Sequence, residues 1–230
     1  MCGRYTLRCT PEVLAEAFQL EEIPDLYPRY NVAPSQWVAC VRAGLRERTR
    51  EAVTLRWGLI PSWARDPAMG MKLINARAET VAEKPSFQKS FRERRCLVPA
   101  DGYYEWKREG ARKQPYYIRL KNGRPFAFAG LWSRWNGEDG KTIESCTILT
   151  TTPNERLASI HDRMPVIVHP GAYEPWLDSG LQDTTRLVPF LTPYPADAMI
   201  AIPVSRRVND PRVDDARCLE ALDEPSRSGT

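Results

Sequence analysis

Apolar and polar residues alternate over several short stretches of the chain, which is the spacing of half-buried β-strands. In 52–59, Val53, Leu55, Trp57 and Leu59 alternate with polar or small residues. Further strands are expected at 3–9, 37–42, 116–120, 126–132, 145–151, 187–191 and 199–204. Residues 96–106 are also expected to be extended, with an interruption at Pro99-Ala100-Asp101-Gly102. The pattern therefore indicates a chain built mainly from short strands.

Turn and capping residues mark the ends of several of these elements. Asn122-Gly123 is the dipeptide preferred in a type I′ turn, and it predicts a hairpin between the strands on either side. Thr10-Pro11-Glu12 offers an N-cap, a proline at the first helical position and an acid in the first turn, so a helix is expected over 10–20. Two more short helices are expected, at about 85–94 and at 154–160.

Proline makes up 20 of the 230 residues, which favours short strands and irregular connections, and 28–35 is too rich in it for regular structure. No internal repeat or low-complexity linker divides the chain. We therefore expect an α+β protein with a single domain over 1–208. A curled, barrel-like, mostly antiparallel sheet should carry a few short flanking helices. The acidic residues after Asn209 predict a loosely ordered tail over 209–230.

Charge and cysteine content narrow the class of protein. The net charge of +4 is too small to establish a nucleic-acid partner by itself. Six cysteines are scattered without a CxxC motif, and there are two histidines, so we expect no metal site and no cofactor. The sequence shows neither an apolar signal segment nor a run long enough to span a bilayer. We therefore expect a reduced, cytoplasmic monomer with no membrane partner.

Cys2 becomes the first residue if an aminopeptidase, or the protein itself, removes Met1. It would then carry an amine and a thiol on adjacent carbons. Because the pKa of an α-amine is about 7.7–8.0, roughly a tenth of it is free base at neutral pH. Such an amine can add to an aldehyde, and the thiol can close a five-membered thiazolidine on the resulting imine. A cysteine at this position can equally be incidental.

Three further stretches carry polar residues that a strand-rich core does not require. Asn75 and Arg77 lie two apart, which points both to one face of a strand. Glu105 stands among aromatic residues, and His161 follows an expected helix. Each has a structural alternative. Asn75 can satisfy a turn, Glu105 can pair with Lys107, and His161 can interact with a helix dipole.

Taken in order, short motifs along the chain resemble the SOS-response-associated peptidase (SRAP) family, whose members shield abasic sites in single-stranded DNA. The resemblance extends from Met1 to about Val204. Each motif is weak alone, whereas the ordered set is highly specific. The motifs are Met1-Cys2-Gly3-Arg4-Tyr5, Asn31-Val32-Ala33-Pro34, Arg56-Trp57-Gly58-Leu59-Ile60-Pro61, Asn75-Ala76-Arg77-Ala78-Glu79, Arg95-Cys96-Leu97-Val98-Pro99-Ala100, Gly102-Tyr103-Tyr104-Glu105-Trp106, Phe128-Ala129-Gly130-Leu131-Trp132 and His161-Asp162-Arg163-Met164-Pro165.

This resemblance implies that the mature Cys2 forms a thiazolidine with the ring-opened sugar of an abasic site. Asn75 would hold the cysteine and the sugar, Glu105 would move protons and stabilise the opened sugar, and His161 would assist proton transfer. Elementary chemistry agrees, because a closed hemiacetal needs an acid–base group to open it. Desolvation would raise the pKa of Glu105 and so keep a usable proton on it near neutral pH. The expected partner is single-stranded DNA with abasic sites, and replication-fork proteins are further candidates.

Basic and aromatic residues near these motifs are candidates for DNA contacts. Arginines can hold backbone phosphates and aromatic rings can stack on flanking bases. Each tryptophan can instead serve the core, and the acid Asp162 stands beside a candidate phosphate contact. The candidates are Arg4, Arg77, Arg163, Trp57, Trp63 and Tyr104.

Three other functions remain open. Glutamine amidotransferases also begin Met-Cys-Gly, and Asn136-Gly137-Glu138 is similar to their substrate-binding tripeptide, although it lies much too late in this chain. A peptidase that acts on other proteins is a second alternative. The third is a single-strand DNA-binding module in which Cys2 is passive.

Overall fold

The computed structural model describes residues 2–22, 25–44, 46, 49–138 and 140–222. The strands are β1 (Tyr5–Leu7), β2 (Arg29–Val32), β3 (Trp37–Ala43), β4 (Arg50–Trp57), β5 (Asn75–Arg77), β6 (Arg95–Ala100), β7 (Gly102–Glu109), β8 (Arg112–Leu120), β9 (Phe126–Asn136), β10 (Thr142–Thr151), β11 (Met164–Pro165), β12 (Ile167–Val168) and β13 (Met199–Pro203). The α-helices are α1 (Pro11–Phe18), α2 (Gln88–Glu93) and α3 (Tyr173–Leu177). The helices expected over 10–20 and 85–94 are thus confirmed as α1 and α2.

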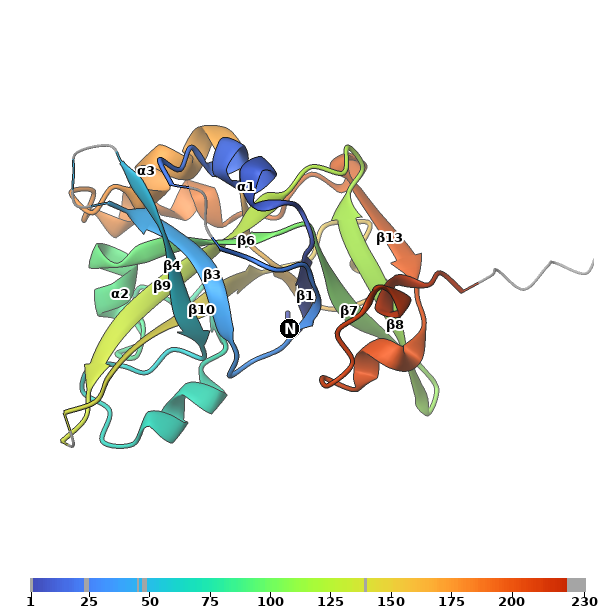
Figure 1. Ribbon diagram of the computed structural model, residues 1–230, viewed down its shortest axis with the longest axis horizontal. Coiled ribbons are helices and arrows are strands. Elements are labelled where there is room, and N and C mark those ends of the chain that lie inside the picture. The colour runs from blue at the N-terminus through green and yellow to red at the C-terminus, as the bar shows by residue number, and fades with distance from the viewer. Residues whose placement is uncertain (1, 23–24, 45, 47–48, 139, 223–230) are drawn as a thin grey trace, which may run out of the picture.

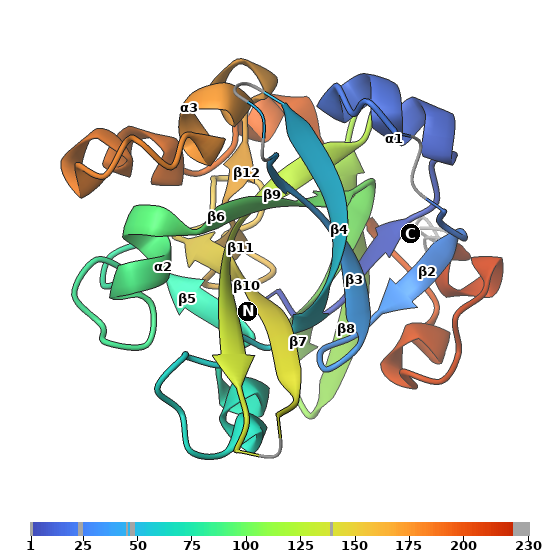
Figure 2. The same cartoon turned by 60° about the vertical axis from the view of Figure 1, so that its left-hand side comes forward.

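A closed barrel forms the larger part of the fold (Figure 2). Antiparallel pairing links β4 to β3, β3 to β6, β6 to β9 and β9 to β10, and β10 closes the ring by pairing in parallel with β4. Cys40, Cys96 and Cys146 are fully buried between these strands. Gly130 fits beside them because a Cβ there would lie 2.8 Å from the sulfur of Cys96. The interior of the barrel is therefore tightly packed around these cysteines.

A second, fully antiparallel sheet lies beside the barrel, with strand order β13-β8-β7-β1-β2. Figure 1 shows β1 between the barrel and the strands β7 and β8. The ring of Tyr5 on β1 packs edge-on against Phe128 of β9, with centroids 5.8 Å apart. Because one hydrophobic cluster runs through both sheets, the chain is a single α+β domain with a barrel and few short helices, as expected from the sequence.

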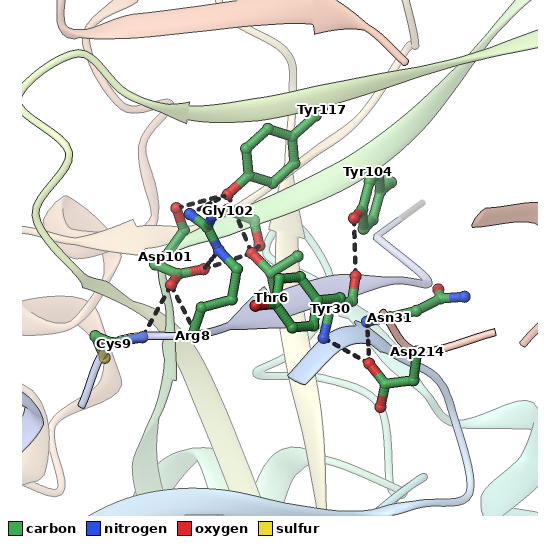
Figure 3. Close-up of polar contacts among 10 residues, drawn as sticks. All are labelled: Thr6, Arg8, Cys9, Tyr30, Asn31, Asp101, Gly102, Tyr104, Tyr117 and Asp214. Atoms are coloured by element: carbon green, nitrogen blue, oxygen red, sulfur yellow. Dashed lines mark hydrogen bonds and ion pairs between the residues drawn. The ribbon is translucent and has the colours of Figure 1, made fainter. Parts of the chain in front are cut away.

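Buried Asp101 ties β1 to the start of β7 (Figure 3). Its carboxylate accepts hydrogen bonds from the Thr6 hydroxyl at 2.5 Å and from the backbone N–H groups of Arg8 and Cys9 at 2.7 and 3.1 Å. The Tyr117 hydroxyl donates to the backbone carbonyl of Asp101 at 3.2 Å. These bonds compensate for the burial of a carboxylate and hold the N-terminal strand in place.

Residues 209–222 are packed against β2, which corrects the expectation of a loosely ordered tail for this part of the chain. Asp214 accepts hydrogen bonds from the backbone N–H groups of Tyr30 and Asn31 at 2.5 and 2.8 Å, and it pairs with Arg29 (Figure 3). The side-chain amide of Asn31 donates to three backbone carbonyls near the C-terminus. The segment therefore satisfies donors along the edge of β2. The rest of the expected tail lies outside the described residues.

The prediction of a hairpin around Asn122-Gly123 is wrong. Gly123 adopts the left-handed φ of +69° that such a turn favours, but the flanking strands do not pair with each other. β8 pairs with β7 and β13 in the second sheet, whereas β9 pairs with β6, β10 and β12 in the barrel. The turn thus carries the chain from one sheet to the other, because partner choice depends on long-range packing.

Three other local expectations are also wrong. The proline-rich stretch 28–35 contains β2, which pairs with β1. Residues 187–191 form a 3-10 helix over Val188–Leu191 where a strand was expected, since a proline there cannot donate to a ladder. Residues 154–160 form turns and not a helix.

Candidate active site

Cys2 lies just ahead of β1 and is fully buried. Burial raises the pKa of its thiol, and the nearby carboxylate of Glu105 raises it further. A thiol in these surroundings keeps its proton at neutral pH, so it needs a neighbouring base before it can act as a nucleophile.

Glu105 comes to the site from β7 and is 3% exposed. Burial raises the pKa of its carboxyl to about 7. A carboxyl with such a pKa exchanges its proton near neutral pH and can act as an acid or a base. Because its charge also acts on Cys2, Glu105 is the candidate base for this thiol.

His161 lies between β10 and β11, and its Nε2 is 3.9 Å from Oε2 of Glu105. Its Nδ1 accepts a hydrogen bond from the backbone N–H of Arg163 at 3.0 Å. The neutral ring therefore carries its proton on Nε2, which faces Glu105. Burial lowers the pKa of His161. Oδ1 of Asp162 also lies 2.9 Å from Nδ1, but that side chain is 87% exposed and solvent screens its charge.

Asn75 opens β5, which pairs in parallel with β10 opposite Ile148. Its Nδ2 donates to the carbonyl of Ile148 at 3.4 Å. Its Oδ1 is buried and accepts no hydrogen bond from any residue that the structure describes. A buried carbonyl oxygen without a donor is unfavourable, so this atom is suited to accept a hydrogen bond from a bound amine or hydroxyl.

The three arginines proposed as phosphate contacts differ in how they are engaged. Arg4 donates to Oδ1 of Asn31 at 2.8 Å and to a carbonyl of the C-terminal segment at 2.7 Å, so it serves the fold. Arg163 is 12% exposed and forms a two-pronged ion pair with Glu79 at 2.7 and 2.9 Å. Arg77 is exposed at the end of β5. Arg77 is therefore the arginine most accessible to a nucleic acid.

The aromatic candidates divide in the same way. Trp57 is 1% exposed, and its indole N–H donates to a backbone carbonyl at 2.9 Å. Tyr104 is fully buried, and its hydroxyl donates to the carbonyl of Tyr30 at 2.8 Å. Neither ring can stack on a base in this arrangement, which corrects the expectation for both. Trp63 is 57% exposed and remains accessible.

Tyr103 is a residue of the site that the sequence did not single out. It is fully buried, and it lies on the same face of β7 as Glu105 because the two are two residues apart on one strand. Its hydroxyl has no hydrogen-bond partner among the residues that the structure describes. Strand alternation counted from Glu105 would have indicated it.

Thiol, carboxyl, imidazole and amide groups make up the chemistry of this site. In the described part of the chain, no group of three or more His, Cys, Asp or Glu side chains is arranged to hold a metal ion. The helices described there include none that is long and apolar enough to cross a membrane.

A closed barrel and, near its N-terminal strand, a buried cysteine that feels the charge of Glu105 define a protein with a candidate thiol–carboxyl–imidazole site. The model of the SOS response associated peptidase (SRAP) family matches residues 1–211, and the chain belongs to this family. The resemblance noted from the motifs is thereby confirmed.

Named relatives and a solved structure agree with this assignment. The chain is 45% identical over 226 residues to the abasic site processing protein YoqW of Bacillus subtilis, covering 96% of this chain and 100% of that protein. It is 34% identical over 269 residues to the abasic site processing protein HMCES of Xenopus tropicalis, covering 96% of this chain and 78% of that protein. A crystal structure of a Bacteroides thetaiotaomicron protein matches with a TM-score of 0.86 at 28% identity, covering 96% of this chain and 100% of that one.

Proposed function

We propose that this protein processes abasic sites in single-stranded DNA by forming a covalent adduct through the mature Cys2. The observation that carries the proposal is buried Glu105, which lies 3.9 Å from His161 and whose charge acts on the thiol of Cys2. Relatives named abasic site processing proteins support the same substrate. The adduct would shield the lesion during the DNA damage response.

The first step is opening of the abasic sugar. The closed hemiacetal must lose the proton of its anomeric hydroxyl while its ring oxygen gains one. The carboxylate of Glu105, whose acid form has a pKa of about 7, can take the first proton and then give it to the ring oxygen. The neutral ring of His161, with Nε2 3.9 Å from this carboxylate, keeps its own proton and assists by orienting Glu105. The products are an aldehyde and a sugar hydroxyl.

The second stage joins the aldehyde to Cys2. The α-amine adds to the aldehyde carbon, water leaves, and an imine forms. The thiol sulfur then bonds to the imine carbon, and its proton ends on the nitrogen of the new thiazolidine. Oδ1 of Asn75, which is buried without a donor among the described residues, would hold the amine or a sugar hydroxyl during these steps.

Removal of Met1 is part of this proposal, because only then do the amine and the thiol belong to one residue. Met1 lies outside the described residues. We propose that Arg77, Arg163 and Trp63 contact the DNA, and that the protein acts as a cytoplasmic monomer on single strands.

The test uses a single-stranded oligonucleotide with one abasic site and protein whose intact mass shows the loss of Met1. We expect an adduct that resists denaturation, and Cys2→Ala should leave only a reversible imine. The matched control is Cys9→Ala, which changes a cysteine that, unlike Cys2, is only partly buried. This variant should form the adduct as wild type does. Tight binding without an adduct by wild type and by Cys2→Ala would overturn the proposal in favour of passive binding. Ammonia release from glutamine without an adduct would favour an amidohydrolase.

A further inference from the structure

Tyr103 has no place in the steps proposed above, although its hydroxyl feels the charges of both Cys2 and Glu105. Its position on β7 is opposite Tyr5 of β1, the strand that Cys2 leads into. It also shares one face of β7 with Glu105. Tyr103 therefore lies beside the strand that Cys2 leads into, and on the same face of β7 as the proposed base.

The hydroxyl of Tyr103 is a buried polar group for which the described residues offer no partner. It has no hydrogen bond to any described residue, and the residue is fully buried. Burial raises the pKa of this hydroxyl, and the charges of Cys2 and Glu105 raise it further. The group thus keeps its proton at neutral pH, and it lies within electrostatic reach of both. An unpaired buried hydroxyl is costly, so a donor without an acceptor points to an acceptor that arises during the reaction.

We propose that the hydroxyl of Tyr103 donates a hydrogen bond to the sulfur of Cys2 as the thiol is deprotonated, and so promotes closure of the thiazolidine ring. This inference rests on the proposed function. In the closing step the carboxylate of Glu105 takes the proton from the sulfur, and a sulfur electron pair forms the C–S bond. The C=N π pair moves to nitrogen, which takes the proton back from Glu105. Tyr103 keeps its own proton throughout.

The structure explains why Cys2 needs such a donor. Burial and the charge of Glu105 both raise the pKa of the thiol, so the thiolate is unfavourable in this pocket. A hydrogen bond to a charged sulfur is stronger than one to a neutral thiol. Tyr103 would therefore stabilise the thiolate more than the resting thiol, which lowers the barrier to ring closure and leaves the earlier attack by the amine unaffected.

The decisive variant is Tyr103→Phe, which keeps the ring contact with Phe128 at 5.8 Å. Protein without Met1 is mixed with the abasic oligonucleotide, and samples are quenched with or without borohydride. Borohydride traps the imine, whereas the thiazolidine survives denaturation without it. We expect an unchanged rate of imine formation and ring closure about tenfold slower. The rate of ring closure should also increase with pH at a higher pH in Tyr103→Phe than in wild type.

Tyr173→Phe is the matched control. Tyr173 is another buried tyrosine, stacked on Phe18 with centroids 5.3 Å apart, and its variant should close the ring at the wild-type rate. Equal closure rates in wild type and Tyr103→Phe would overturn the inference. An equal decrease in the rates of imine formation and ring closure would also overturn it. So would a shifted pH profile for imine formation, which would mean that the Tyr103 hydroxyl acts on Glu105 and not on the sulfur of Cys2.

A second variant keeps the test decisive if Tyr103→Phe does not fold. A ring-fluorinated tyrosine incorporated at position 103 fills nearly the same space and donates a stronger hydrogen bond. Ring closure should become about twofold faster, and a slower or unchanged rate would contradict the inference. Absence of any adduct with wild type would instead refute the proposed function itself.

Discussion

Glu105 and His161 form a pair on which burial acts in opposite directions. It raises the pKa of the carboxyl to about 7 and lowers the pKa of the imidazole. Near neutral pH both groups therefore tend towards their neutral forms, with Nε2 and Oε2 separated by 3.9 Å. A carboxyl with this pKa beside a neutral imidazole can take a proton from the anomeric hydroxyl and return it to the ring oxygen, so hemiacetal opening leaves the net charge of the pair unchanged.

The raised pKa of Glu105 predicts how stability depends on pH. The folded carboxyl binds its proton more tightly than the unfolded one, whose pKa is about 4.5. Its stabilising effect is thus complete below that value and is lost as pH rises through about 7. Glu105→Gln cannot titrate and so does not suffer this loss. The free energy of unfolding of the variant, relative to that of wild type, should therefore be about 3 kcal/mol higher at pH 8 than at pH 4.

Urea denaturation across this pH range measures the difference between the two proteins. Glu109→Gln changes a carboxyl on the same strand that is 49% exposed, and its stability curve should run parallel to that of wild type. Parallel curves for Glu105→Gln as well would show that the carboxyl of Glu105 titrates normally in the folded protein.

Glu105→Gln should also slow formation of the DNA adduct. The amide fills the same space but neither takes nor gives a proton near pH 7. General acid–base catalysis contributes about 10²–10⁴-fold, so we expect a loss of about 100-fold in the rate of adduct formation. Denaturing gels with the abasic oligonucleotide measure this rate. An unchanged rate would remove Glu105 from the acid–base role.

The ion pair between Glu79 and Arg163 predicts an increase in DNA affinity. Glu79 accepts two hydrogen bonds from the guanidinium of Arg163, at 2.7 and 2.9 Å. Glu79→Gln releases that guanidinium for phosphate, so binding to intact single strands should tighten, and the slope of log affinity against log salt should steepen by about 0.7.

Fluorescence anisotropy over a range of salt concentrations measures both quantities. Glu83→Gln is the control, because it removes one negative charge from an exposed residue nearby without releasing Arg163. If the two variants gain equally, general charge and not Arg163 is responsible.

Asp214 predicts that the C-terminal segment contributes to stability. Its carboxylate accepts from two backbone N–H groups of β2 and pairs with Arg29. Asp214→Ala leaves these donors without an acceptor and should lower the free energy of unfolding by about 2–4 kcal/mol. Asp215→Ala removes only a local, exposed contact with Arg217, so it should cost about 1 kcal/mol or less. Equal losses in urea denaturation would contradict this role of Asp214.

Sequence patterns correctly predicted elements whose cause is local. Alternation over 52–59 predicted β4, and the Thr10 side chain caps α1 by accepting from the backbone N–H of Val13 at 3.4 Å. Spacing along the same strand could also have indicated Tyr103 on the face of Glu105, although it was not used. In each case the cause lies within a few residues, so it can be seen without a fold.

Burial and pairing across long distances in the chain were not predictable in this way. Trp57 and Tyr104 were candidates for base stacking until the packing of the two sheets enclosed them. The segment around Asp214 was expected to be loose, because its acidic composition does not reveal the unpaired donors of β2 that it satisfies.

The amino-acid sequence by itself determined the strand-rich class, the caps and turns, and the presence of a thiol, a carboxyl and an imidazole. Only the tertiary structure decided which strands pair, and that His161 reaches Glu105 across a gap of 3.9 Å. The physical reason is that local conformation depends on near neighbours, whereas burial, and the pKa shifts that follow from it, depends on residues brought together from the whole chain.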